Sequence, residues 1–392
     1  MTVRFTRDGA PATNGATPRP FTEAELAETR RPLLEATQLP PRAYVDEDVA
    51  DWEAERLFLG GWVCVGHAQP LSSRGAFVTR DIGGESLLFM GDDDGRAHGV
   101  FNVCRHRGAR LVTEPEGTMR RLQCPYHAWC YGFDGQLKSA PHTDEILNFE
   151  KPSLTPVRME ERGGLLFADI SGVAGPLDDH LGDLTPHLER YRLGELERHG
   201  AITYDVESNW KAIVENYSEC LHCPGVHPEL NRLSHYMSGD EYYGEGAWCG
   251  GSMTLNEGAE TMAQNGGHGQ RPAIKGLTEK EQRDVLYFAL FPNLLVSLHP
   301  DYVMVHTLWP RGAGRTEVVC EWYFEPETAA RPDFDPSDAV GFWDMVNRQD
   351  WHVCELVQRG IGSRGHVPGR YTDNELTVHA FDQLVAEAYL TR

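Results

Sequence analysis

The sequence has no long apolar run and an excess of negative charge, and both features exclude classes of protein. No stretch of about 18 consecutive apolar residues occurs, so no segment is expected to span a membrane. The first residues lack the apolar core of a secretory signal peptide. Only 36 Lys and Arg residues stand against 59 Asp and Glu residues, which gives a formal net charge of −23. A nucleic-acid partner is not expected, because such binding needs a basic surface.

Two cofactor motifs are also missing. The chain has neither the Gly-x-Gly-x-x-Gly fingerprint of a dinucleotide-binding fold nor the Cys-x₄-Cys-x₂-Cys run of a plant-type ferredoxin. It is therefore not expected to take hydride from NAD(P)H by itself. Of its nine cysteines, the seven outside the metal motif described next show no disulfide-scaffold spacing, which favours a reducing, cytoplasmic location.

Two short motifs supply a set of four metal ligands. Cys104 and His106 form a Cys-x-His motif, and Cys124 and His127 form a Cys-x-x-His motif. Two thiolates with two imidazoles are the ligands of a Rieske [2Fe–2S] centre, in which the cysteines hold one iron and the histidines hold the other. A zinc site is the alternative, but zinc fingers place both cysteines before both histidines. The order therefore predicts a Rieske cluster.

A second metal site is expected around His222 and His227. These histidines are five residues apart, and Pro224 and Gly225 interrupt any helix between them, so both rings could reach one ion. A carboxylate from elsewhere would complete a 2-His-1-carboxylate triad, which leaves one side of Fe(II) open for O₂ and substrate. Asp350 is the best candidate for that carboxylate.

The histidine pair taken alone allows other interpretations. Two structural histidines are the commoner explanation of such a pair, and Cys220 and Cys223 beside them permit a zinc site. Thiolates would make a poor O₂-activating iron site, however, and the same chain carries a Rieske motif. The iron interpretation is therefore preferred.

Local sequence patterns divide the chain into three parts. Residues 1–43 are expected to form a leader and a helix over residues 21–36, which would pack on a catalytic domain. Residues 44–170 read as a small antiparallel β domain, and residues 171–392 mix helices with longer strands. The expected strands are 62–66, 77–82, 86–90, 97–103, 286–299, 302–309 and 316–324, and the expected C-terminal helices are 342–359 and 375–389.

The motifs resemble those of Rieske non-haem iron oxygenase α subunits over essentially the whole chain. The segments that carry the resemblance are Asn102-Val-Cys-Arg-His-Arg-Gly108, Cys124-Pro-Tyr-His-Ala-Trp129, the Glu-x-x-His-x₄-His block and the block from Gln349 to Gly360. The resemblance implies an α+β fold in which a small antiparallel β Rieske domain precedes a helix-grip catalytic domain. It also implies a homotrimer, O₂ as co-substrate and a separate NAD(P)H-dependent reductase with flavin and iron–sulfur groups.

Glu219 marks a departure from the commoner family pattern. The resemblance implies a carboxylate that connects His127 of one subunit to His222 of the next, as a bridge for electrons. Most members have Asp at this position, and the surrounding Asn-Tyr-x-Glu-Cys-x-His-Cys resembles the branch of carnitine, choline, glycine betaine and proline betaine oxygenases. This implies monooxygenation, by hydroxylation or N-demethylation, of a small quaternary ammonium compound. The alternative is that Glu219 has no bearing on the substrate.

An N-methyl cation is held best by aromatic faces. The second half of the chain supplies many, and each taken singly is more often an ordinary core residue. Tyr302 and Trp309 lie on an expected strand that crosses the active site in the family, and Trp248 and His299 are further candidates. His299 and His306 could bind a substrate carboxylate or could simply be packed. The other aromatic candidates are Tyr217, Tyr236, Tyr242, Tyr243, Tyr287 and Phe288.

Three other functions compete with this one. A Rieske oxygenase could act on an aromatic substrate, by ring dihydroxylation or O-demethylation. A non-catalytic Rieske electron carrier would need only the first domain, so the large C-terminal half argues against it. A zinc-structured binding protein would be colourless.

Overall fold

The computed structural model describes residues 18–141, 152–269 and 271–391. Their contacts divide the chain into two compact units. The first unit runs from Phe58 to Ala174, and the second joins Arg19–Leu57 to Gly175–Arg392. The expected division at residues 43/44 and 170/171 stays a prediction, and most of the expected leader, residues 1–17, lies outside the described residues.

The first unit is built on a seven-stranded antiparallel sheet in the order β1-β10-β9-β4-β3-β2-β5. A second sheet of three short strands has the order β6-β7-β8. The four strands expected between residues 62 and 103 are confirmed to within two residues at each end. The strands are β1 (Trp62–His67), β2 (Ala76–Ile82), β3 (Glu85–Gly91), β4 (Ala97–Phe101), β5 (Glu116–Thr118), β6 (Leu122–Gln123), β7 (Cys130–Tyr131), β8 (Leu137–Ser139), β9 (Pro156–Arg162) and β10 (Leu165–Asp169).

The second unit has its own seven-stranded antiparallel sheet, in the order β11-β17-β16-β15-β14-β13-β12. Its central strands β15, β16 and β17 are almost entirely buried, because the sheet is covered by helices and loops. The strands are β11 (Glu197–Val206), β12 (Glu241–Tyr243), β13 (Trp248–Thr254), β14 (Asp284–Leu290), β15 (Leu294–Leu298), β16 (Val303–Pro310) and β17 (Thr316–Phe324).

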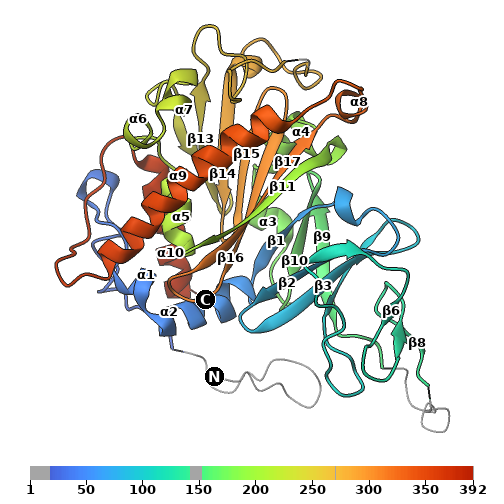
Figure 1. Cartoon of the computed structure of the whole chain (residues 1–392). Helices are drawn as coiled ribbons and strands as arrows, with labels where there is room; N and C mark the ends of the chain where they lie inside the picture. Colours follow the sequence, from blue (N-terminus) through green and yellow to red (C-terminus); the bar gives the residue numbers. More distant parts are fainter. Residues whose placement is uncertain (1–17, 142–151, 270, 392) are drawn as a thin grey trace. The chain divides into compact units, whose positions relative to one another are not determined.

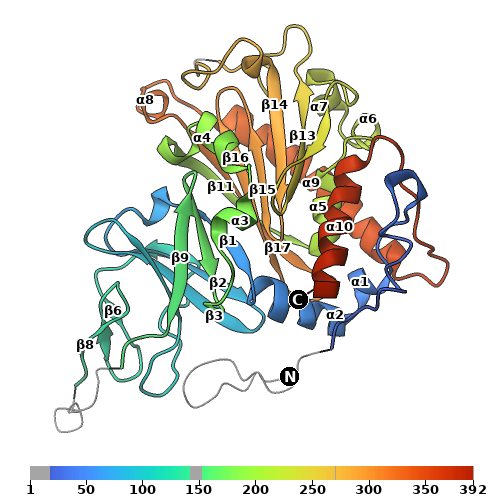
Figure 2. The ribbon, with the colours of Figure 1, turned by 180° about the vertical axis from the view of Figure 1, so that it is seen from behind.

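One long helix, α9 (Ser337–Ile361), crosses this sheet on one face, as Figure 1 shows, and Figure 2 shows the same sheet from behind. This arrangement confirms the expected α+β class, with a helix laid against an antiparallel sheet. No helix of the described residues is long and apolar enough to cross a membrane. The other helices are α1 (Arg42–Val45), α2 (Glu47–Glu53), α3 (Leu177–Leu181), α4 (Thr185–Arg190), α5 (Trp210–Tyr217), α6 (Cys223–Val226), α7 (Pro228–Leu233), α8 (Pro326–Ala329) and α10 (Leu376–Thr391).

The helix expected over residues 21–36 is wrong. The segment begins with a helical turn, in which Glu25 accepts hydrogen bonds from both the backbone N–H and the hydroxyl of Thr22, each at 2.8 Å. It continues only as turns and a short 3₁₀ helix at Leu33–Glu35. Pro32 prevents a helix from continuing past Arg31, because proline has no N–H to donate and its ring disfavours a helical conformation of the residue before it.

The single strand expected over residues 286–299 is also wrong in its extent. The structure divides it into β14 and β15, which pair with each other as an antiparallel hairpin. Pro292 lies in the connection between them, where it is tolerated because no ladder hydrogen bond is required of it. The remaining C-terminal expectations, two strands and two helices, are confirmed.

A buried ion pair ties three helices of the second unit together. The Lys211 ammonium on α5 lies 2.6 Å from the Glu53 carboxylate at the end of α2, and the two side chains are 0% and 3% exposed. The indole of Trp210 donates to the same carboxylate at 2.9 Å, and so does the hydroxyl of Tyr389 on α10. Burial lowers the pKa of Lys211, and the nearby Glu53 charge opposes that shift only in part. These bonds fix α5, from which the chain runs directly into the site described below.

Replacing Lys211 with Met should destabilise the second unit strongly, because it leaves the Glu53 carboxylate buried without a cation. We expect a loss of roughly 3 kcal/mol in the free energy of unfolding, measured by urea denaturation. Lys275→Met is the matched control, since Lys275 pairs with Glu327 at the surface, with side chains 54% and 78% exposed. That control should cost less than about 1 kcal/mol. Equal losses in the two variants would contradict the argument, and adding Glu53→Gln to Lys211→Met should restore part of the loss.

Candidate metal centres and cavity

The four residues of the first metal motif lie on two similar loops of the first unit. In one loop the Cys104 N–H donates to Ala109 O at 2.8 Å, and in the other the Cys124 N–H donates to Trp129 O at 2.8 Å. These bonds close each loop around its ligands. Both cysteines are buried, at 2% exposure, within the hydrophobic core of this unit.

The two histidines of this motif lie at the surface and face each other. The rings of His106 and His127 are 4.6 Å apart, and His106 stacks on Trp129 at 4.7 Å. The Cys104 sulfur lies 3.3 Å from the hydroxyl of Tyr131. Buried sulfurs and surface imidazoles fit a [2Fe–2S] cluster whose histidine-bound iron is the one nearer to solvent.

The second metal motif is positioned by the end of α5 and by α9. Asn209 caps α5, because its side-chain oxygen accepts from the Lys211 N–H at 3.0 Å and its amide donates to Ala313 O at 2.7 Å. After α5 the chain turns, so that His222 comes just before α6 and His227 lies between α6 and α7. Asp350 comes from the middle of α9, which lies more than a hundred residues further along the chain.

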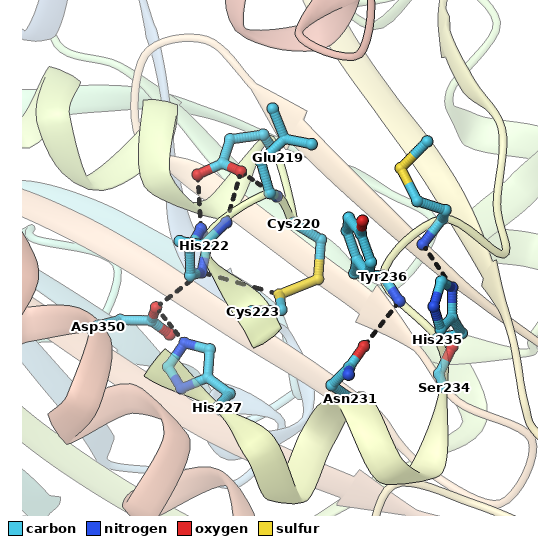
Figure 3. Close-up of a disulfide and its surroundings, with 12 residues drawn as sticks. Glu219, Cys220, His222, Cys223, His227, Asn231, Ser234, His235, Tyr236 and Asp350 are labelled. Atoms are coloured by element: carbon cyan, nitrogen blue, oxygen red, sulfur yellow. Dashed lines mark hydrogen bonds and ion pairs between the residues drawn. A yellow bond between two sulfur atoms is a disulfide. The ribbon is translucent and has the colours of Figure 1, made fainter. Parts of the chain in front are cut away.

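These three side chains converge on one point (Figure 3). The Asp350 Oδ1 atom lies 2.7 Å from Nε2 of His227 and 3.3 Å from Nε2 of His222. One ligand atom of each residue lies within 4.8 Å of the others. No other set of three His, Cys, Asp or Glu side chains with ligand atoms this close occurs among the described residues. Two imidazoles and one carboxylate fit a mononuclear Fe(II) site with open positions.

In each of the two histidines, Nδ1, the ring nitrogen that faces away from Asp350, lies close to an acceptor of its own. His222 Nδ1 lies 2.5 Å from Oε1 of Glu219, and His227 Nδ1 lies 2.7 Å from Oε1 of Gln349. A neutral imidazole that donates from Nδ1 keeps Nε2 available for a metal, so both partners set the orientation that ligation needs. The contact of Gln349 with His227 was not predicted from the sequence. Its place directly before Asp350 is the signal that could have indicated it.

Charges around the site hold a proton on His222. Burial lowers the pKa of His222, but hydrogen bonds and charge from Asp350 and Glu219 outweigh it and raise the pKa to about 10. Burial raises the pKa of Asp350, and its bonds to His222 and His227 outweigh that effect and lower it. A divalent metal takes the place of such a proton, because a ligating imidazole must be neutral.

The structure pairs Cys220 with Cys223 in a disulfide, which the cysteine spacing did not predict (Figure 3). The Cys223 sulfur lies 3.9 Å from Nε2 of His222. Two bonded sulfurs offer no thiolate to a metal, so this pairing opposes the zinc site that the two cysteines had left open. The metal-binding group therefore consists of nitrogen and oxygen donors.

A cavity of about 380 Å³ opens on this group. Its lining includes His222, His227 and Asp350 together with four aromatic side chains, which are Tyr217, Tyr236, Tyr287 and Trp343. The ring of Tyr287 lies 5.9 Å from that of Tyr217 and 6.5 Å from that of Trp343, in edge-on arrangements. Three of these aromatics were among the sequence candidates, whereas Trp343 was not.

The four residues singled out as substrate contacts lie elsewhere. Tyr302, Trp309 and His299 have exposures of 0%, and Trp248 has an exposure of 3%. None of them is among the residues that line the cavity. Tyr302 donates to the backbone of Met262 at 2.6 Å, and His299, whose ring nitrogens have no hydrogen-bond partner among the described residues, stacks on Tyr302 at 4.2 Å. Trp248 and Trp309 likewise donate to groups of the protein, at 2.9 and 3.0 Å.

Two family models match this chain. Residues 61–150 match the Rieske [2Fe-2S] domain, and residues 193–391 match the ring hydroxylating alpha subunit (catalytic domain). The two metal motifs described above fall in these two segments, one in each.

Curated relatives match most of the chain. The glycine betaine monooxygenase oxygenase subunit of Chromohalobacter salexigens is 30% identical over 366 residues, which cover 85% of this chain and 81% of that protein. The carnitine monooxygenase oxygenase subunit of Escherichia coli is 29% identical over 346 residues, which cover 85% of this chain and 86% of that protein.

Solved structures share the fold. The quaternary ammonium Rieske monooxygenase CntA in complex with L-carnitine has a TM-score of 0.77 at 24% identity, covering 94% of this chain and 99% of that chain. Naphthalene 1,2-dioxygenase from Rhodococcus sp. has a TM-score of 0.74 at 21% identity, covering 91% of this chain and 95% of that chain.

Members of this family are oxidoreductases that use O₂, and they receive electrons from a separate protein. The sequence, the fold and the matches agree on these points. The chain belongs to the Rieske-type ring-hydroxylating oxygenases, as an oxygenase subunit with a Rieske [2Fe–2S] domain and a mononuclear-iron catalytic domain, and it is related to the quaternary ammonium monooxygenases.

Proposed function

We propose that this protein monooxygenates a small quaternary ammonium substrate, by hydroxylation or N-demethylation. It would use O₂ and electrons from a separate NAD(P)H-dependent reductase, and it would work as a homotrimer. Cys104, His106, Cys124 and His127 would hold the [2Fe–2S] cluster. In the catalytic unit, His222, His227 and Asp350 would hold the mononuclear iron.

The aromatic lining of the cavity carries this proposal. A quaternary ammonium group has no N–H to donate, and aromatic faces are the surfaces that bind it best. Tyr217, Tyr287 and Trp343 offer such faces in the same cavity as the three proposed iron ligands. We therefore assign the substrate head group to these three rings rather than to Tyr302, Trp309, Trp248 and His299, which lie outside the cavity.

Relatives support the same substrate class. Relatives of this chain include oxygenase subunits named for glycine betaine and for carnitine, and they match over most of their length. The likeness to naphthalene 1,2-dioxygenase, at 21% identity, is a likeness of fold. An aromatic substrate, dihydroxylated on the ring or O-demethylated, is the alternative.

The side chains of this site would hold the metal ions and orient both the metal ligands and the substrate. When bound, the [2Fe–2S] cluster supplies single electrons and the mononuclear iron activates O₂. Glu219 and Gln349 hold the two imidazoles in the orientation for ligation, by accepting from their Nδ1 atoms. The aromatic rings would place a C–H beside the cationic nitrogen toward the metal. Glu219 would in addition bridge His222 to His127 of a neighbouring subunit, and its contact with His222 is one half of that bridge.

Removing one proposed iron ligand should abolish one metal site and leave the other intact. We expect His222→Ala and Asp350→Ala each to lose mononuclear iron and product formation, because two ligands bind Fe(II) too weakly. The visible and EPR spectra of the Rieske cluster should survive in both variants. His352→Ala, an exposed histidine near Asp350 on α9, is the control and should keep both metals. Loss of the cluster spectrum in the ligand variants would contradict the division into two sites.

Glu219→Gln should keep both metals and weaken their coupling. The amide keeps the size of the side chain and an acceptor for His222, but it removes the negative charge. We expect the rate of product formation to fall by about 10- to 100-fold, as for other groups that orient a metal ligand. Unchanged product formation with full metal content would refute the bridge.

A substrate screen tests the proposed function as a whole. Reconstituted enzyme with a generic reductase and NADH would be offered proline betaine, glycine betaine, choline and carnitine beside aryl methyl ethers and simple arenes. Organic products should be measured by mass spectrometry, because uncoupled O₂ reduction also consumes NADH. We expect demethylated or hydroxylated amines, whereas products from arenes or aryl ethers only would favour the alternative.

A further inference from the structure

We propose that the Cys220–Cys223 disulfide controls which metal the site of His222, His227 and Asp350 binds. While the bond is closed, the site offers only the nitrogen and oxygen donors that suit Fe(II). When the bond is opened, Cys223 becomes a fourth ligand and the site binds zinc instead. The inference rests on the proposed function, because it concerns the site at which the mononuclear iron would act, and it adds a second metal state to that site.

The disulfide encloses one of the proposed iron ligands. Cys220 and Cys223 are three residues apart, so the ring that they close contains Leu221 and His222. Both cysteines line the cavity together with His222. Figure 3 shows that the sulfur of Cys223 is the one beside the His222 ring. Opening or closing this bond therefore changes the immediate surroundings of the metal position.

The sulfur of Cys223 lies close to the nitrogen that faces the metal position. It is 3.9 Å from Nε2 of His222, and the same nitrogen lies 3.3 Å from Oδ1 of Asp350. A tetrahedral zinc ion with Zn–S and Zn–N bonds of about 2.3 and 2.1 Å holds its sulfur and nitrogen ligands about 3.6 Å apart. The observed separation is near this value. Rotation of the Cys223 side chain about its Cα–Cβ bond, which the disulfide prevents, would bring the sulfur to the ion.

The type of donor decides which metal is favoured. Two imidazoles and one carboxylate leave positions open on Fe(II) for O₂ and substrate. A thiolate from Cys223 would complete the four-coordinate set that zinc prefers, and soft thiolate ligands favour zinc. Zinc has no redox chemistry, and the added sulfur would occupy one of the open positions. The opened form would therefore be an inactive state of the same site.

A structural staple is the plain explanation of a disulfide, and the position of this one argues against it. In the loop-closure account a disulfide stabilises more when it closes a longer loop, and this one joins residues only three apart. Cys220 lies in the turn after α5 and Cys223 is the first residue of α6, so the bond joins no distant elements. Cys220 is half-buried and both cysteines line the cavity, which offers a small reductant access to the bond.

A third cysteine lines the same cavity and provides a comparison. Cys249 on β13 is in no disulfide, and its side chain is 0% exposed. Burial raises the pKa of its thiol to about 12, so the thiol stays protonated near pH 7. The thiolate is the form that binds metals. Cys249 is therefore not expected to take the place of Cys223 at the ion.

Both reactions of the bond balance with simple reagents. An external dithiol opens it, because the two cysteine sulfurs gain two electrons and two protons while a new S–S bond forms in the reductant. Hydrogen peroxide closes it, taking two electrons and two protons from the cysteines and becoming two molecules of water. O₂ that gains two electrons and two protons without oxidising a substrate becomes hydrogen peroxide, so uncoupled turnover would supply this oxidant beside the disulfide.

Zinc is the probe of the test. The catalytic site would be loaded with one equivalent of zinc while the Rieske cluster is retained, and part of the sample would be reduced with a phosphine, which becomes its oxide and contains no sulfur. X-ray absorption at the zinc edge reports the neighbours of zinc alone, so the iron of the cluster does not interfere. We expect a Zn–S distance of about 2.3 Å in the reduced protein and only nitrogen and oxygen neighbours in the oxidised protein.

The affinity for zinc should follow the same change. We expect the zinc Kd to fall by at least about tenfold on reduction, since even partners that only orient a ligand change metal affinity by about 10- to 100-fold. The Kd would be measured by competition with a chelator of known affinity, at fixed pH in both redox states. An unchanged Kd together with an absent Zn–S bond would overturn the proposal.

Two serine variants separate the roles of the two cysteines. Cys220→Ser leaves Cys223 without its disulfide partner, so the Zn–S bond should appear without any reductant. Cys223→Ser removes the proposed ligand, so the Zn–S bond should be absent in both redox states. Cys249→Ser is the matched control at the third cysteine of the cavity and should behave as the unchanged protein does. A purely structural disulfide predicts the same result for Cys220→Ser and Cys223→Ser, and that result would overturn the proposal.

The closed state and the proposed function are read separately. Mass spectrometry of the peptide that contains both cysteines should show a disulfide after treatment with peroxide, and two free thiols would overturn the control by redox state. The oxidised protein loaded with Fe(II) should form product from a quaternary amine. Failure of that reaction beside a Zn–S bond in the reduced protein would overturn the proposed function and leave the metal control standing.

Discussion

The proposed iron site depends on one carboxylate that reaches two imidazoles from a distant part of the chain. Oδ1 of Asp350 lies 2.7 Å from His227 and 3.3 Å from His222, and this convergence marks the proposed metal position in the wall of the cavity. For these three side chains to meet, α9 must cross the sheet beside the turn that follows α5. The outer acceptors Glu219 and Gln349 then fix the two rings, so five side chains share one constraint.

The elements that support this convergence are held by buried polar bonds. Glu53 and Lys211 join α2 to α5, and Tyr389 brings in α10 at the same carboxylate. Asn209 caps α5 and bonds to the loop at Ala313. Such bonds are directional, whereas apolar packing alone tolerates small shifts between helices. Their place beside the first residues of α5 fixes the turn that carries the two proposed iron-ligating histidines.

Three strands of the same sheet contribute residues to the wall of the cavity. Glu241, Gly251 and Tyr287 pair in one row across β12, β13 and β14, and all three line the cavity. The metal ligands come from helices and turns on the other wall of the cavity. The proposed metal ligands and the strand residues of the cavity wall thus come from different elements.

Short motifs predicted the Rieske ligands and the histidine pair, the resemblance of these motifs to a known family predicted the enzyme class, and local patterns predicted most strands. Cys104, His106, Cys124 and His127 lie close in the chain, so local order distinguished a Rieske cluster from zinc. The sequence did not predict which aromatic side chains line the cavity. Tyr302 and Trp309 were predicted as contacts because their strand crosses the active site in the resembled family, but both side chains are buried in the core. The helix expected over residues 21–36 is replaced by turns, and Pro32 prevents a helix from continuing past Arg31. Only the tertiary structure decided which aromatics face the cavity and that Glu241 and Tyr287 share it, because strand pairing joins residues that are far apart in sequence.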